Sequence, residues 1–415
     1  MDSRAHHRPF DLAIYGATGF TGKQAARQLW EACRAHGLNL TLAGRSSEKL
    51  NAVRRELGTE AEAKIGISVA ESSDEEAINR LALSTRVLVN NAGPYSKYAP
   101  KVIQACVNAE TDYLDITGET PFVRKMIDLH HERAHRRKIR IVPFCGFDSV
   151  PSDYSVWYAL NRWKENFRDE ACESVTTYFE VRGGFNGGTI ESAFTLASDG
   201  EIQRLQNDLT LLCPREGPHP RAPKDWTSPR RLQKLDAWSA PFFMSPVNTR
   251  VVRRTQSLFG IETAHPLSQH WKQIRYEEGL LIRGPMAPLA ARAMSDGMKV
   301  FSKLSSNQKI SKWVRKLLPR PGEGPTENQM NTGFMRLTTH ARGLNGSFQT
   351  TQLKAKGDPG NRITVGILTQ AALCLALPEE RARLSARYGV LTPAYAFEEV
   401  LFQRLKALGF EFSQL

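Results

Sequence analysis

Close to its start, the chain carries a short apolar run that leads into a turn marked by glycines. Residues 11–22 read DLAIYGATGFTG. Gly16 permits a tight turn, Gly19 allows the main chain to approach a pyrophosphate, and Gly22 lets the following helix pack closely on the strand. The spacing is GxxGxxG, a variant of GxGxxG that the same physics allows. The pattern predicts a dinucleotide-binding strand–helix unit whose contacts with the cofactor come from Gly16, Thr18, Gly19, Phe20, Thr21 and Gly22.

The exit of the next predicted strand indicates which nicotinamide cofactor binds. Residues 40–47 read LTLAGRSS, a short strand followed by Arg45, Ser46 and Ser47. A site for NAD usually places an acidic side chain here for the ribose 2′-hydroxyl, whereas arginine and serine offer donors to a 2′-phosphate. We therefore predict NADPH, bound through Arg45 and Ser46. The alternative is that Arg45 is a solvated arginine at the start of a helix over residues 47–57.

The first third of the chain alternates short, β-branched apolar runs with helical stretches. Further strands are predicted at residues 65–69, 86–91, 113–116 and 139–143. This alternation is typical of a doubly wound parallel sheet of the Rossmann type, in which strands are buried on both faces. The NNAGPY turn after the fourth strand should lie at the carboxyl edge of that sheet, where such folds bind ligands. We expect Asn91, Ala92 and Gly93 to contact the cofactor there.

Beyond about residue 154 the pattern changes, and strands of period two appear at 174–181, 334–339 and 347–353. We predict an α/β protein with a second, α+β domain. Residues 1–153 form the Rossmann domain, and residues 154–375 form a substrate or dimerisation domain with an irregular insertion at about 213–324. Residues 376–415 form a helical segment that returns to the first domain.

Two segments supply candidate catalytic residues. Tyr95 follows the Gly-Pro turn and could point into the cofactor crevice, and CGFDSVPSD at 145–153 should line the cleft between the domains. Tyr95, Ser149 and Asp148 are therefore the candidates. Alternatively, Tyr95 packs with its hydroxyl bonded to main chain, and Ser152 and Asp153 cap a helix beginning near Tyr154. The carboxylates of TDYLDITGE at 111–119 are interpreted mainly as caps or as ribose and loop contacts.

Composition limits the class of protein. The 415 residues are 41% hydrophobic and 24% charged, as in an ordinary soluble globular protein. The six cysteines are scattered, so neither a disulfide framework nor a metal site is predicted, and no apolar run reaches the roughly 20 residues of a spanning helix. We expect a cytoplasmic protein, with homodimer formation left open.

The net charge of +13 calls for a partner or a solvated basic face. Basic residues concentrate at 133–138, 229–234 and 299–320, which could attract phospholipid or an acidic carrier protein, and no nucleic-acid module is visible. Residues 309–318, KISKWVRKLL, place Ile310, Trp313, Val314 and Leu317 on one side of a helix. This predicts either a helix on a membrane surface or a stripe that packs on the second domain.

Taken together, these segments resemble the saccharopine dehydrogenase-like oxidoreductases, and most closely the branch called trans-acting enoyl reductases. The matching motifs span nearly the whole chain: GATGFTG at 16–22, AGRS at 43–46, NNAGPY at 90–95, TDYLDITGE at 111–119, CGFDSVPSD at 145–153, GGT at 187–189, GEGPTE at 322–327 and GVLTPA at 389–394. The resemblance implies a nicotinamide-dependent oxidoreductase whose Rossmann domain is followed by a saccharopine-reductase-like domain.

The resemblance leads us to expect an NADPH-dependent reductase of the C=C bond of an enoyl thioester in lipid or polyketide metabolism, acting on a small-molecule or carrier-bound acyl substrate. Two alternatives stay open. One is a C–N oxidoreductase acting on an amino-acid-derived substrate, which would need an arginine or lysine clamp for several carboxylates. The other is a nucleotide-binding protein of lipid surfaces with little turnover.

Overall fold

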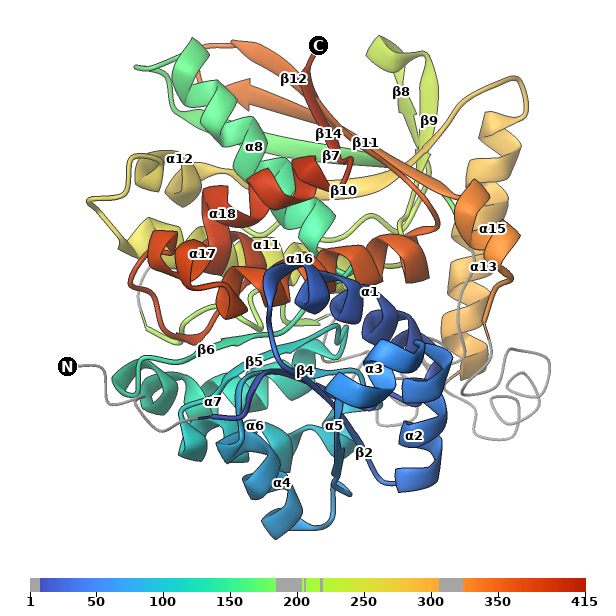
Figure 1. Cartoon of the computed structure of the whole chain (residues 1–415). Helices are drawn as coiled ribbons and strands as arrows, with labels where there is room; N and C mark the ends of the chain where they lie inside the picture. The colour runs from blue at the N-terminus through green and yellow to red at the C-terminus, as the bar shows by residue number, and fades with distance from the viewer. Residues whose placement is uncertain (1–7, 184–203, 205–206, 217–218, 306–323) are drawn as a thin grey trace.

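The computed structural model describes residues 8–183, 204, 207–216, 219–305 and 324–415. Two seven-stranded sheets form separate layers, and a band of helices lies between them (Figure 1). The predicted segments 187–189 and 309–318, and the first two residues of 322–327, lie outside the described residues. Within the described part of the chain, no helix combines the length and the apolar character that crossing a membrane requires.

The first sheet has the strand order β13-β6-β5-β4-β1-β2-β3, and its neighbours pair in parallel. In β1 the central residue Ile14 pairs with Leu42 of β2 and with Val89 of β4. The predicted Rossmann-type sheet is thereby confirmed, and the change of direction falls at β1. The strands are β1 (Phe10–Tyr15), β2 (Leu40–Gly44), β3 (Gly66–Val69), β4 (Thr85–Asn90), β5 (Asp112–Asp115), β6 (Arg140–Val142) and β13 (Gly389–Val390).

Helices cover both faces of this sheet. On one face, α1 (Phe20–His36) packs beside α16 (Thr364–Ala376), and on the other lie α4 (Glu75–Leu83), α6 (Pro100–Ala109) and α7 (Thr120–Arg136) (Figure 1). Shorter helices complete the layer: α2 (Ser47–Glu56), α3 (Thr59–Lys64) and α5 (Tyr95–Tyr98). Although α16 lies within the stretch predicted as the second domain, it packs on β4 and β5 of the first sheet.

The second sheet has the order β14-β12-β11-β7-β10-β9-β8, antiparallel except for the parallel pair β7 and β10. Its strands are β7 (Cys172–Arg182), β8 (Arg230–Leu232), β9 (Ala237–Ala240), β10 (Arg275–Ile282), β11 (Phe334–Gly343), β12 (Phe348–Lys356) and β14 (Glu411–Gln414). The face toward the first sheet is covered by α8 (Val150–Asn166), α11 (Ser245–Ile261) and α18 (Pro393–Ala407) (Figure 1). This confirms a second α+β unit.

The stretch predicted as an irregular insertion, 213–324, is more regular than expected. It supplies three strands of the second sheet together with α11, α12 (Ser268–Gln273) and α13 (Ala287–Ser305). The pattern is hidden because α11 is buried almost throughout, including Arg250, Arg253 and Arg254. A helix buried on all sides shows no polar face, and its buried arginines make its sequence look like surface. Two short helices, α15 (Glu327–Thr332) and α17 (Pro378–Arg383), complete the fold.

The helix predicted to begin near Tyr154 begins instead at Val150. Pro151 occupies its first turn, where the missing N–H of proline is tolerated. Ser152 and Asp153 therefore lie inside α8 and do not cap it, and the boundary predicted after Asp153 falls within this helix.

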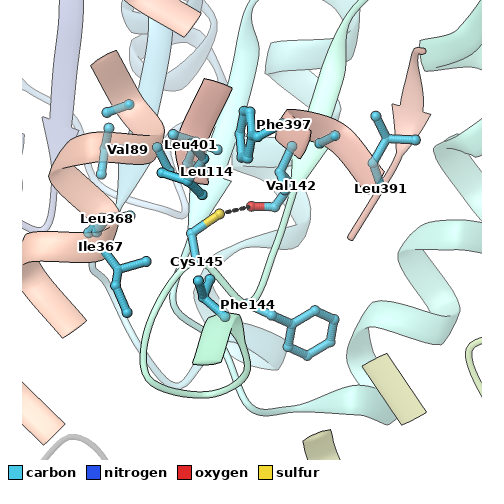
Figure 2. Packing of buried hydrophobic residues seen from close by; sticks show 14 of the residues in the cluster. Val89, Leu114, Val142, Phe144, Cys145, Ile367, Leu368, Leu391, Phe397 and Leu401 are labelled. Atoms are coloured by element: carbon cyan, nitrogen blue, oxygen red, sulfur yellow. Dashed lines mark hydrogen bonds between the residues drawn. The ribbon is translucent and has the colours of Figure 1, made fainter. Parts of the chain in front are cut away.

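The two layers share one hydrophobic core. Figure 2 shows the contact region, where Val89, Leu114 and Val142 of the first sheet meet Ile367 and Leu368 of α16 and Phe397 and Leu401 of α18. Because interiors are packed as densely as organic crystals, a shared core fixes the two layers relative to each other. Side chains that enter the space between them are therefore held in a defined geometry.

Candidate active site

In the turn after β1, close main-chain contacts within the protein require glycine at two of the three positions, and the third leaves space beside the main chain. Gly16 has φ +82, and a Cβ there would lie 2.8 Å from the nitrogen of Ala92. A Cβ on Gly22 would lie 2.1 Å from the carbonyl oxygen of Gly16. At Gly19, however, a Cβ would meet only that same oxygen, at 3.6 Å, an ordinary contact. The described residues do not require glycine at position 19, whereas a ligand approaching the main chain would.

Gly19 is also the N-cap of α1, and no side chain caps this helix. Thr18, Phe20 and Thr21 are half-buried around the same turn. The free N–H groups in the first turn of this seventeen-residue helix lie at the glycine turn, where a phosphate group is expected to bind. The turn therefore fits a dinucleotide in its main-chain geometry.

Asn91 gives an independent test of that fit. Its main-chain N–H donates to the carbonyl of Tyr15 at 2.8 Å, which sets the residue beside the glycine turn. Both polar atoms of its side chain, Oδ1 and Nδ2, are buried and have no partner among the described residues. Buried amides are normally paired. A bound nicotinamide dinucleotide would supply these partners, with Ala92 and the exposed Gly93 following on the same loop.

The two residues predicted to bind a 2′-phosphate lie at the exit of β2. Arg45 is exposed, and no ion pair or hydrogen bond to another described side chain holds it. Ser46 is the N-cap of α2, and its Oγ accepts the N–H of Lys49 at 3.3 Å. Its hydroxyl proton stays available for donation, because the cap uses the oxygen only as an acceptor.

A fully bonded polar cluster lies at the ends of β4 and β5. The Asn90 amide donates to the Tyr113 hydroxyl at 2.9 Å, and Tyr113 donates to Asp115 at 2.8 Å. Asp115 also accepts the N–H of Thr117 at 3.0 Å. Burial raises the pKa of the Asp115 carboxyl to about 7, and these hydrogen bonds oppose that shift. The sequence-based interpretation of these carboxylates as loop contacts agrees with this geometry.

Glu119 and Tyr95 extend the cluster. The carboxylate of Glu119 accepts the main-chain N–H groups of Tyr95 and Ser96, each at 2.8 Å. The Tyr95 hydroxyl donates to the carbonyl of Asn90 at 3.4 Å, which is long for an O–H···O bond. Burial, together with the Asp115 and Glu119 carboxyls, holds the pKa of Tyr95 well above its usual range. Tyr95 is thus fixed through its main chain and remains a neutral phenol with a weakly held hydroxyl.

The loop after β6 is anchored at several points. The Cys145 thiol donates to the carbonyl of Val142 at 3.2 Å within the shared core (Figure 2). Phe147 packs edge-on against Phe179 and Phe242 of the second layer. Asp153, four residues into α8, accepts the N–H of Ala394 at the start of α18, at 2.8 Å. Asp153 therefore caps α18, whereas the sequence predicted that it would cap α8.

Between these anchors, Asp148 and Ser149 hold polar atoms with no partner. Oδ1 of Asp148 and Oγ of Ser149 are buried and unbonded among the described residues. Burial, and next the Glu278 carboxyl, raises the pKa of Asp148 to about 7. A carboxyl of this kind can hold a proton near neutral pH and give it to a substrate. The structure thus brings the predicted Asp148 and Ser149 together, while Tyr95 belongs to the bonded cluster.

The second layer contributes residues that sequence reasoning missed. Glu278 of β10 is 2% exposed, and Ser245 and Asn248 of α11 carry further buried polar atoms that no described residue bonds. The start of α11 lies near the loop after β5, because a Cβ on Gly118 would be 3.9 Å from Met244 and Val247. In the sequence, Glu278 is marked only as an acidic residue within the apolar strand YEEGLLI, at a position whose side chain the alternation of a strand directs toward the core.

Comparison with known proteins agrees with this geometry. Residues 12–142 match the family model of the saccharopine dehydrogenase NADP binding domain. A trans-acting enoyl reductase of Mycobacterium leprae is 34% identical over 425 residues, covering 97% of this chain and 97% of that protein. One of Mycobacterium ulcerans is 34% identical over 426 residues, with the same coverage. Saccharopine dehydrogenase (L-Glu forming) from Saccharomyces cerevisiae shares the fold, with a TM-score of 0.54 at 13% identity over 98% of this chain and 99% of that chain.

The fold, the glycine turn and the matched domain define an NAD(P)-dependent oxidoreductase of the saccharopine dehydrogenase-like class. Within this class, the chain belongs to the family of trans-acting enoyl reductases.

Proposed function

We propose that the protein uses NADPH to reduce the C=C bond of an enoyl thioester, carried either by a small molecule or by a carrier protein. The observation that supports this most is the pair of buried polar groups on Asp148 and Ser149, which have no partner in the described part of the chain and lie between the dinucleotide-binding layer and the second layer. The chemistry that a bound reduced nicotinamide supplies is hydride transfer to the β-carbon. The protein must then stabilise charge on the thioester oxygen and deliver a proton to the α-carbon.

Three side chains are proposed for these tasks. The neutral, weakly held hydroxyl of Tyr95 donates to the developing oxyanion, with the Ser149 hydroxyl as a second donor. A donor of this kind is typically worth about 10²–10³ in rate. Asp148, protonated up to about pH 7, gives the proton to the α-carbon.

The direct test follows the absorbance of NADPH with an enoyl thioester of pantetheine and with its saturated counterpart. We expect oxidation only with the enoyl compound, and a product heavier by two hydrogens in mass spectrometry. The control is Gly22→Val, because its side chain would collide with the Gly16 carbonyl and distort the cofactor turn. Oxidation of NADPH only with a 2-oxo acid plus an amine would overturn the proposal.

The preference for NADPH is proposed to rest on Arg45 and Ser46. A 2′-phosphate would meet the exposed guanidinium of Arg45, whereas NADH offers no such group. Arg45→Ala should therefore weaken NADPH binding by about 10-fold or more and leave NADH affinity nearly unchanged. Fluorescence titration measures both, and equal wild-type affinities for the two cofactors would contradict this proposal.

The C–N oxidoreductase alternative needs a basic clamp for substrate carboxylates, and the buried arginines of α11 are engaged elsewhere. Arg253 donates to the carbonyls of Leu209 and Pro223, and Arg254 donates to those of Leu212 and Val390. Arg250 pairs with Asp225. These contacts engage all three arginines within the protein, so they favour the enoyl reductase proposal.

The lipid-surface alternative has support at α13. Leu289 and Val300 of α13 are 63% and 54% exposed, at a spacing that recurs on one side of a helix, and Met286, 63% exposed, lies just before the helix. Ala291 and Ser295 are buried on the opposite side, and Arg292 and Lys299, which both pair with Asp296, lie beside the apolar side chains. We propose that this stripe contacts anionic lipid, which would bring a lipid-type substrate to the enzyme.

Flotation with anionic liposomes tests the stripe. Wild-type protein should float with the lipid at low salt and less at high salt, and Leu289→Glu should abolish flotation. The matched control is Leu129→Glu on α7, since Leu129 is equally exposed at 65% but lies on another helix. Equal flotation of both variants, or no binding by the wild type, would contradict the proposal.

A further inference from the structure

We infer that Ser245 and Asn248, at the start of α11, bind a secondary amide of the pantetheine arm that carries the acyl thioester. The inference rests on the proposed function, because both a small-molecule thioester and a carrier-bound thioester can present the acyl group on such an arm. It assigns a substrate contact to the second layer, through two residues outside the predicted catalytic set.

Each of these two side chains has one buried polar atom that the protein leaves unbonded. Ser245 is 2% exposed and Asn248 is 1% exposed. Oγ of Ser245 and Oδ1 of Asn248 have no hydrogen-bond partner among the described residues. Because buried polar groups are normally paired, these two atoms indicate a bound group that is not part of the described chain.

The start of α11 lies between the two layers. Toward the first layer, a Cβ on Gly118 would be 3.9 Å from the side chains of Met244 and Val247, and Gly118 follows β5 at the carboxyl edge of the first sheet. Toward the second layer, Nδ2 of Asn248 donates to Oε1 of Glu278 in β10 at 2.9 Å. Both layers therefore fix the position of the unbonded atoms.

Glu278 also links this turn to the helix that follows the catalytic candidates. Its Oε2 accepts the Ser152 hydroxyl at 2.9 Å, while its Oε1 accepts the Asn248 amide. Ser152 lies in the first turn of α8, and Ser149 is the N-cap of the same helix. One carboxyl thus joins the first turns of α8 and α11. A pantetheine arm is long enough to extend from one turn to the other.

The two unbonded atoms match the two polar atoms of an amide. Since the Asn248 nitrogen donates to Glu278, the atom left over is an oxygen, which can only accept. The Ser245 hydroxyl can donate. Residues three apart on a helix are neighbours on its surface. Asn248 is therefore placed to accept the N–H of a secondary amide, and Ser245 to donate to the carbonyl.

The surroundings favour a neutral ligand over an anion. The Glu278 carboxyl lies beside Asn248, and the main-chain N–H groups of Ser245 and Asn248 already donate to carbonyls at 3.0 and 2.9 Å. Further along α11, Arg250 pairs with an aspartate and Arg253 donates to two main-chain carbonyls. A carboxylate or phosphate would meet an acidic neighbour here, whereas an amide meets one donor and one acceptor.

The test compares two saturated thioesters that differ in a single N–H group. One is the butanoyl thioester of N-acetylcysteamine, a short mimic of pantetheine, and in the other an ester oxygen replaces the amide nitrogen. Ligand-observed NMR measures both affinities without turnover. Wild-type protein should bind the amide about 10-fold more tightly, because the ester leaves the Asn248 oxygen buried without a donor. Equal affinities, or no binding of either compound, would overturn the inference.

Two variants assign the contact to its residues. Asn248→Ala should bring the affinity ratio of the two compounds to about one, and Ser245→Ala should weaken both about 10-fold while keeping the ratio. Loss of the Glu278 contact in Asn248→Ala affects both compounds equally, so the ratio still reports the amide contact. A ratio that persists in Asn248→Ala would refute the inference. If that variant fails to fold, undiminished binding by Ser245→Ala refutes it equally.

The matched control is Ser257→Ala, on the same helix about three turns further along. Ser257 is also buried, but its hydroxyl donates to the Arg253 carbonyl at 3.0 Å. The control should keep both affinities and their ratio. A loss in this variant as large as that in Ser245→Ala would show that the loss is not specific to the start of α11, and would count against the inference.

The corresponding enoyl thioesters separate this inference from the proposed reaction. If NADPH is not oxidised with either compound, but the affinity ratio and its loss in Asn248→Ala are observed, the amide contact holds and the proposed C=C reduction fails. If both enoyl compounds are reduced with equal kcat/KM, the reduction holds and the amide contact fails.

Discussion

Two polar regions lie at the carboxyl edge of the first sheet, and they differ in how completely their hydrogen bonds are made. At the ends of β4 and β5, the Asn90, Tyr113 and Asp115 side chains bond to one another, and Glu119 binds two main-chain N–H groups. After β6, Asp148 and Ser149 carry buried polar atoms without partners among the described residues. Unmade hydrogen bonds in a buried site cost stability. The first region therefore stabilises the edge, and the second leaves groups available to a substrate.

The largest effect should come from breaking the bonded region. Glu119→Ala removes the acceptor of the Tyr95 and Ser96 N–H groups, and should lower the free energy of unfolding by about 3 kcal/mol. Urea denaturation measures this loss. Glu119→Gln keeps one acceptor oxygen and should lose about half as much. A loss below about 1 kcal/mol in Glu119→Ala would remove the distinction between the two regions.

In the loop after β6, where the polar groups lack partners among the described residues, a substitution should lower kcat rather than stability. Asp148→Asn keeps the shape of the side chain but cannot give up a proton, so kcat should fall by about 100-fold. Steady-state kinetics with the enoyl thioester gives kcat, and titration gives an NADPH affinity close to that of the wild type. A variant that turns over at the wild-type rate would show that the unpartnered carboxyl is not the proton donor.

Tyr95 lies at the boundary between the regions, bonded through its main chain and weakly held at its hydroxyl. Tyr95→Phe keeps the ring and deletes the donor, and kcat should fall by about 10-fold. Because its hydrogen bond to Asn90 is long, the free energy of unfolding should fall by less than about 1 kcal/mol. If stability falls and kcat does not, Tyr95 belongs to the bonded region and the oxyanion donor is Ser149.

The smallest effect concerns pH and stability. Burial raises the pKa of Asp148 from its ordinary 3.8 to about 7, so between these values the folded state binds more protons than the unfolded state. Its contribution to stability is complete below about pH 4 and is lost as pH rises to about 7. Asp148→Asn should therefore raise Tm by about 2 °C at pH 8 and leave it unchanged at pH 4. Thermal unfolding at both values measures this, and a rise at pH 4 as well would point to packing as the cause.

The sequence predicts well what short stretches encode. Six of the seven strands of the first layer and the glycine turn follow from local apolar runs and glycine spacing, and the structure confirms these strands. The cofactor-binding and catalytic residues remain predictions. The buried side-chain amide of Asn91, which has no partner among the described residues, supports the predicted cofactor site. The position of that residue, after a strand and before a Gly-Pro turn, was local information too.

What the sequence could not predict depends on long-range packing. Glu278 bonds to Ser152 of α8 only because β10 pairs with β7 in the second sheet, and nothing in YEEGLLI specifies that neighbour. Likewise, the arginines of α11 look like surface residues until the main-chain carbonyls that they bind are known. A helix with buried charged residues is difficult to predict from the sequence, because the spacing of its apolar residues no longer marks the face that packs in the core.

The C-terminal segment also bears on how the protein folds as it is made. Gly389–Val390 completes one edge of the first sheet, and Glu411–Gln414 completes one edge of the second. Until these residues leave the ribosome, β6 and β12 are open edges of the kind that pair with other chains. Both layers therefore reach their final form only after this segment has been made, and chains truncated before it expose two open sheet edges at once.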